Sequence, residues 1–245
     1  MEDLQKASLW KRISAFLFDM ILLGIAAVLF AWALSAVCGY DGWQKTLDDA
    51  YTRYGEAYGV DFRVDLAGFD ALEEAYQALA ADKDAVRAYD MVMQLTVTIT
   101  SLGILLAFAA LEFAVPLFLG DGRTLGKRIF SLGVMRREHI RIRGPSLFVR
   151  VFLGKYAIET MIPVLVGMMI YWGSIGVVGP VVLLLIAVTE AAVMIATPGN
   201  AMIHDLLADT VVIDHPSQRI FDTREDRIAW IEKKHAEMAA EQTDG

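Results

Sequence analysis

Long apolar stretches separated by polar segments dominate the hydrophobicity pattern of the chain. Residues 13–40 and 91–119 each contain a single charged residue, and residues 156–196 contain two. A helix of about 20 apolar residues crosses the hydrocarbon core of a bilayer. The pattern therefore predicts an all-α, polytopic transmembrane helical bundle.

The third stretch is too long for one span. As one helix it would measure about 60 Å at 1.5 Å per residue, roughly twice the thickness of the hydrocarbon core. The run Trp172-Gly-Ser-Ile-Gly176 predicts a turn, which gives spans near 156–172 and 175–196 and four spans in all. Because the first of these is short and contains Pro163, a re-entrant segment at 156–172 is the alternative.

The segments between and beyond the spans have distinct compositions. Leu47, Tyr51, Tyr54 and Tyr58 recur at helical spacing and predict an outward-facing helical hairpin, and the charged tail from Asp222 to Gln242 predicts a helix. The expected parts are 1–40 (N-terminus and span one), 41–90 (acidic insertion), 91–119 (span two), 120–155 (basic loop), 156–196 (spans three and four) and 197–245 (C-terminal segment).

Basic residues in the short loops indicate the orientation. Residues 38–90 contain five basic and twelve acidic side chains, whereas the loop after span two is strongly basic. Its basic residues are Arg123, Lys127, Arg128, Arg136, Arg137, Arg141, Arg143, Arg150 and Lys155. We therefore expect the basic loop and both termini to be cytoplasmic.

Composition narrows the class of protein. The chain has 245 residues, of which 56% are hydrophobic, and its formal charge of −8 hides the separation of acidic and basic segments. The single cysteine, Cys38, excludes an intramolecular disulfide and a multi-cysteine metal site. We recognise no catalytic residues, cofactor fingerprint or metal constellation, and we expect neither an enzyme nor a nucleic-acid partner.

Four acidic residues fall inside the predicted spans: Asp19, Glu112, Glu159 and Glu190. Counted from the cytoplasmic ends of the spans, all four lie about 5–10 Å deep. Arg12 precedes Asp19 by two helical turns and is its expected partner. Charges in a membrane are costly unless they are paired.

These carboxylates predict a polar network in the inner leaflet. Its candidate members are Arg12, Asp19, Glu112, Glu159, Glu190 and Asp205. In one interpretation the network binds a monovalent cation or carries protons. In the other it only fixes helix packing. The outer half offers little beyond Gln94, Thr98 and Ser101 to line a conduit, which argues against a simple ion wire.

The basic loop suggests contacts with lipid. Gly120–Arg128 superficially resembles a phosphate-binding loop, but it has Asp121 in place of the first glycine of that motif and Arg128 in place of its Ser or Thr. A glycine-rich basic loop directly after a span can instead bind anionic lipid headgroups. The candidate interface residues are Arg123, Lys127, Arg128, Arg150 and His204.

Several motifs together resemble the RDD family of membrane proteins. They are Leu9-Trp-Lys-Arg12 followed by Asp19, Gly122-Arg-Thr-Leu-Gly-Lys-Arg128 with Leu132-Gly-Val134, Arg150, and His204-Asp-Leu-Leu-Ala-Asp-Thr-Val-Val212. The resemblance maps the name-giving Arg and two Asp residues to Arg12, Asp19 and Asp205, and implies a bacterial membrane protein. Some members are associated with sodium/proton exchange. The acidic insertion and the charged tail depart from the usual pattern.

Two functions remain open. The first is cation or proton transport, or an accessory role in it, in the bacterial plasma (inner) membrane. The second is a non-enzymatic scaffold or assembly factor that binds other membrane proteins, or a second copy, through the hairpin and the tail.

Overall fold

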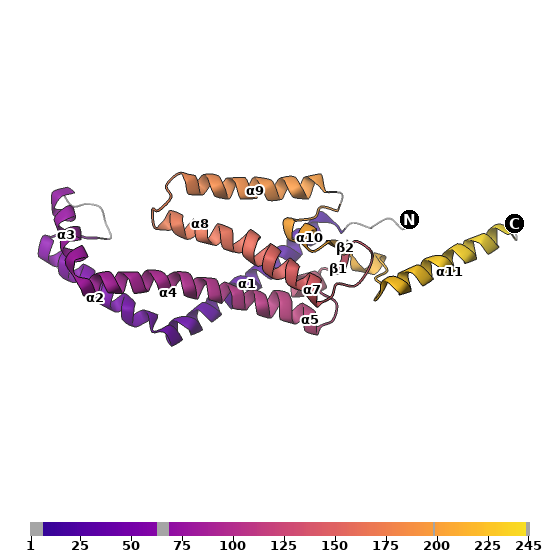
Figure 1. The fold of residues 1–245 in the computed structure, drawn as a ribbon, viewed down its shortest axis with the longest axis horizontal. Helices are drawn as coiled ribbons and strands as arrows, with labels where there is room; N and C mark the ends of the chain where they lie inside the picture. Colours follow the sequence, from indigo (N-terminus) through magenta and orange to yellow (C-terminus); the bar gives the residue numbers. More distant parts are fainter. Residues whose placement is uncertain (1–6, 63–68, 198, 244–245) are drawn as a thin grey trace. The chain divides into compact units, whose positions relative to one another are not determined.

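Four helices of the computed structural model are long and apolar enough to cross a membrane (Figure 1). They are Leu9–Cys38, Lys83–Phe118, Gly144–Tyr171 and Val178–Ala196. This confirms the predicted all-α polytopic bundle. The structure describes residues 7–62, 69–197 and 199–243; residues 1–6, 63–68, 198 and 244–245, which belong to the predicted parts 1–40, 41–90 and 197–245, lie outside the described residues.

The chain divides into two compact units, Ile25–Leu106 and the remainder. The helix α1 (Leu9–Cys38) belongs to both units, and its part in the first of these ends where Gly39 adopts a left-handed conformation, with φ +66°. The helices α2 (Tyr40–Tyr58) and α3 (Phe69–Ala81) pack on each other, and α4 (Lys83–Ala107) follows α3.

Aromatic side chains hold the α2–α3 hairpin together. The Phe62 ring contacts the Tyr51 ring at 5.3 Å and the Tyr76 ring at 5.1 Å between centroids. The Asp82 carboxylate accepts hydrogen bonds from Arg53 (2.5 Å) and from the Tyr54 hydroxyl (3.2 Å). Tyr51 and Tyr54, two of the residues at helical spacing in the sequence, therefore contact the rest of the hairpin.

Two of the long helices in the other unit contain π-helical segments. The π-helix η1 (Phe108–Ala114) leads into α5 (Val115–Phe118), and the π-helix η2 (Val149–Met161) joins α7 (Gly144–Phe148) to α8 (Ile162–Tyr171). The third long helix begins at Gly144, with Pro145 in its first turn, and so includes twelve residues before the predicted span 156–172. A turn at 172–177, with Gly173 at φ +67°, leads into α9 (Val178–Ala196).

A two-stranded antiparallel sheet, which the sequence analysis did not predict, joins the segments that precede and follow the last two long helices. The strands β1 (Leu132–Arg136) and β2 (Thr210–Asp214) pair with Val134 opposite Val212. Lys11, near the start of α1, forms an ion pair with Asp214 at 2.8 Å. These contacts bring three separate chain segments to one end of the unit.

Short helices complete this end of the unit. They are α6 (Leu125–Ile129), α10 (Ile203–Leu207) and the 3₁₀ turn His215–Ser217. The last helix, α11 (Arg224–Thr243), begins with a reciprocal cap in which the Asp226 amide donates to the Thr223 hydroxyl and the Thr223 amide donates to Asp226. The Trp230 ring anchors α11 on Phe221.

Candidate functional site: a buried charge cluster

Ten ionisable side chains from six segments gather at the end of the unit where the small sheet lies. We call this group the charge cluster: Arg12, Asp19, Glu112, Lys127, Arg150, Lys155, Glu159, Glu190, His204 and Asp205. Five of them are almost inaccessible, with Asp205 only 1% exposed and Arg150 only 3% exposed. Charges this deeply buried are tolerated when they are paired.

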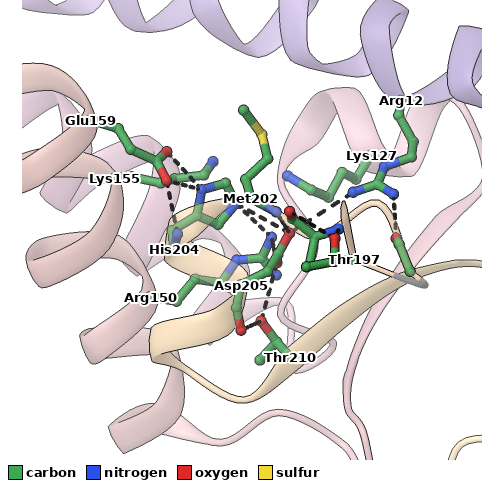
Figure 2. Close-up of polar contacts among 12 residues, drawn as sticks. Arg12, Lys127, Arg150, Lys155, Glu159, Thr197, Met202, His204, Asp205 and Thr210 are labelled. Carbon is green, nitrogen blue, oxygen red and sulfur yellow. Dashed lines mark hydrogen bonds and ion pairs between the residues drawn. The ribbon is translucent and has the colours of Figure 1, made fainter. Parts of the chain in front are cut away.

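Asp205 lies at the centre of the cluster (Figure 2). Its Oδ1 accepts from Arg150 Nη2 at 2.7 Å and from the Thr210 hydroxyl at 3.1 Å. Its Oδ2 accepts from the Met202 amide at 3.3 Å and lies 3.9 Å from Arg12 Nη2. Burial disfavours the charged form, but the neighbouring cationic groups outweigh it and hold the pKa of Asp205 below its ordinary value.

His204 connects Arg150 to Glu159. Its Nδ1 lies 2.7 Å from a Glu159 carboxylate oxygen, and its backbone amide donates to the other oxygen at 2.8 Å. Its Nε2 lies 3.1 Å from Arg150 Nη2, which can only donate. The contacts assign a neutral imidazole protonated on Nδ1, and burial accordingly lowers the pKa of His204.

Asp19 has other partners than the expected Arg12. Its carboxylate accepts hydrogen bonds from the Thr124 hydroxyl (2.5 Å) and the Gly126 amide (2.7 Å), and Lys127 Nζ lies 3.9 Å away. The predicted pair is wrong because seven residues separate the two Cα atoms by about 10 Å along the helix axis. Side chains also lean toward the helix N-terminus, which directs Arg12 away from Asp19.

Glu112 and Lys155 form a further ion pair, at 2.5 Å. Lys127, at the edge of the cluster, is close to this pair, and its Nζ also contacts the Thr124 hydroxyl at 3.2 Å. Burial lowers the pKa of Lys127 to about 7, with the positive charge of Lys155 acting in the same direction and Glu112 opposing it. Lys127 is therefore poised to exchange a proton near neutral pH.

The π-helix η2 brings three charged residues onto one face. In an α-helix, Arg150, Lys155 and Glu159 would spread over about half of the helix surface at 100° per residue. A π-helix, whose hydrogen bonds run from i to i+5, takes more residues per turn than an α-helix, so these three side chains spread over a narrower part of its surface. The extra width of η2 therefore directs these three side chains toward the same cluster.

Glu190 differs from the other carboxylates. Both of its carboxylate oxygens are buried and have no hydrogen-bond partner. The charged groups that act on it are Glu159 and Asp205, which repel its negative form; the Ile203 amide is close but does not complete a hydrogen bond. A second buried group without a partner is Nη1 of Arg150.

The structure places the five expected lipid-contact residues in two groups. Lys127, Arg150 and His204 lie inside the charge cluster, so their side chains do not face the surface. Arg123 and Arg128 both bond Asp121 Oδ2 at 2.7 Å. Arg123, Lys127, Arg128 and Arg150 thus have carboxylate partners within the protein, and the neutral His204 contacts Glu159.

Sequence reasoning missed the neutral groups of the site. Thr124 and Thr210 each donate a hydroxyl hydrogen bond to a buried aspartate. Gly126 is equally specific, because a Cβ atom there would lie 2.4 Å from the Ala15 carbonyl oxygen. The position of Thr124 just before a short helix was the one available signal, since it also caps α6.

The fold and the cluster together define a polytopic helical membrane protein with a network of buried ion pairs near one end of its long helices. The chain belongs to the RDD family, whose family model matches residues 6–209. A search of curated proteins and one of solved structures found no match. Among residues 7–62, 69–197 and 199–243, no group of three His, Cys, Asp or Glu side chains is arranged to hold a metal ion.

Proposed function

We propose that this protein is a transport protein of the bacterial inner membrane, or an accessory of one, and that its charge cluster binds protons or a monovalent cation from the cytoplasmic side. In this proposal the protein is not an enzyme, and both termini are cytoplasmic. Anionic lipids surround the end of the protein that carries the basic loop, residues 120–155.

The unpartnered Glu190 carboxylate carries the proposal. A buried carboxylate without a hydrogen-bond donor and beside two negative groups is costly when ionised. Taking up a proton or a cation removes that cost. Intramembrane carboxylates of this kind are typical of proton relays and ion pathways.

The neighbouring groups offer an exit for such a proton. Glu159 accepts from His204 Nδ1, and the imidazole contacts Arg150 through Nε2. A carboxylate next to an imidazole exchanges protons readily near neutral pH. Protons that reach Glu190 therefore have a second acceptor within the cluster.

The contacts at the basic end support the proposed orientation. The pairing of β1 with β2 and the Lys11–Asp214 ion pair hold the N-terminal segment, the basic loop and the segment after α9 together. All three then lie on one side of the membrane, and the excess of arginine and lysine in the loop favours the cytoplasm.

Proton flux in proteoliposomes tests this function. A pH-sensitive dye inside the vesicles reports flux on addition of Na⁺ or K⁺, for the unmodified chain, Glu190→Gln and the neighbouring control Thr189→Val. Thr189 donates its hydroxyl to the Leu185 carbonyl of its own helix, outside the cluster. We expect flux that Glu190→Gln abolishes and Thr189→Val retains. Flux equal to that of empty vesicles would exclude transport.

A scaffold is the second candidate function, and α11 favours it. Its first turns are held by Trp230 on Phe221 and by the Arg224–Glu138 ion pair. The exposed charges that follow can bind a partner protein. Under this function, deletion of residues 44–88 or 232–245 abolishes the capture of specific membrane partners while the core stays folded, and unchanged partners contradict it.

A further inference from the structure

A pocket of about 570 Å³ lies at the end of β1, away from the charge cluster residues. Four arginines line it, Arg136, Arg141, Arg143 and Arg224, together with Ser146. We call it the arginine pocket. Three acidic residues, Glu138, Asp222 and Glu225, also line it, so its positive groups are partly compensated.

Two of the four arginines are engaged in ion pairs. Arg141 Nε lies 3.1 Å from the Asp222 carboxylate, and Arg224 Nη2 lies 2.5 Å from Glu138. These pairs satisfy the Asp222 and Glu138 carboxylates and fix one wall of the pocket. The remaining two arginines are the ones available to a ligand.

Arg136 and Arg143 have donors left over. The Nε of Arg136 is buried and has no hydrogen-bond partner. Arg143 is exposed, and its bond is to a neutral acceptor, the Asp222 carbonyl, at 3.2 Å. A buried guanidinium donor without an acceptor in the protein is unusual, and an anion that reaches it would gain a charge-assisted hydrogen bond.

We propose that the arginine pocket binds a phosphate group, carried by an anionic lipid headgroup or present as free phosphate. Planar guanidinium groups pair with phosphate oxygens through two parallel hydrogen bonds, which suits Arg136 and Arg143. Pro145 and Ser146, in the first turn of the long helix Gly144–Tyr171, line the same pocket. The pocket therefore lies where that helix enters the membrane interface, within reach of headgroups.

Lipid binding to the full chain in detergent tests the proposal. Native mass spectrometry measures the dissociation constants of phosphatidylglycerol and of phosphatidylcholine with the same acyl chains. The variants are Arg143→Gln, the double variant Arg136→Gln with Arg143→Gln, and the control Arg137→Gln. Arg137 is next to Arg136 in the chain and pairs with Asp209 outside the pocket. Melting temperatures show that each variant is folded.

We expect phosphatidylglycerol to bind at least about tenfold more tightly than phosphatidylcholine, a preference that the double variant loses and Arg137→Gln keeps. Arg143→Gln alone, at an exposed position, reports on the pocket even if the double variant does not fold. If millimolar inorganic phosphate displaces the lipid, a free phosphate group is sufficient for binding. If the lipid stays bound, the headgroup and the membrane interface are required. Equal binding of the two lipids, or an equal loss in Arg137→Gln, would overturn the proposal.

Discussion

Arg12 and Asp205 lie 3.9 Å apart, between the guanidinium Nη2 and the carboxylate Oδ2, although 193 residues separate them in the chain. The same guanidinium donates to the Gly199 carbonyl at 2.9 Å. Arg12 therefore links the first long helix to the segment that follows the fourth. Asp205 is held from the other side by Arg150, at 2.7 Å.

The Arg150–Asp205 pair should dominate the stability of this end of the protein. Both side chains are buried, so Asp205→Asn leaves a buried guanidinium without its counter-charge, and we expect a loss of about 3–5 kcal/mol in the free energy of unfolding. The double variant with Arg150→Met should recover part of the loss. Denaturant unfolding in detergent measures both.

The exposed pair Lys11–Asp214 is the matched control for this cycle. Its side chains are 46% and 27% exposed, so Lys11→Gln should cost less than about 1 kcal/mol. A loss in Asp205→Asn as small as that in Lys11→Gln would contradict the central role of Asp205.

Hydrophobicity was sufficient to predict the four long helices, and counting from their ends placed the four acidic residues at similar depths. The structure brings Asp19, Glu112, Glu159 and Glu190 to one cluster, together with Asp205. Depth along a helix can be counted from residue numbers, so a single sequence is sufficient to predict it.

The pairing within the cluster was beyond sequence reasoning. It depends on the π-helix η2, whose alignment of Arg150 with Glu159 no α-helical count reproduces. It also depends on the sheet, which positions Thr210 against Asp205. Thr210-Val-Val-Ile213, a run rich in β-branched residues, was the available signal for β2.

Gly154→Ala should separate α10 from the helix that carries η2. A Cβ atom at this position would lie 2.5 Å from His204 Cβ and 2.6 Å from His204 Cα, so the backbone itself must move. We expect a loss of about 1–3 kcal/mol in the free energy of unfolding. Gly167→Ala, whose Cβ meets nothing within 4 Å, is the control and should not destabilise. Equal stability of the two variants would show that α10 is not docked there.

Lys127 should make stability rise with pH above neutrality. Its pKa is lowered to about 7 in the folded protein, mainly by burial, whereas an unfolded chain keeps a lysine pKa of about 10.4. The unfolded state thus binds more protons between these values, and stability increases with pH across that window. Lys127→Met removes this contribution, so the melting temperature should rise less between pH 7 and pH 9.5 than in the unmodified chain. Lys45→Met, at an exposed position of α2, should keep the original slope. Identical slopes for Lys127→Met and the unmodified chain would mean that Lys127 stays charged in the folded state.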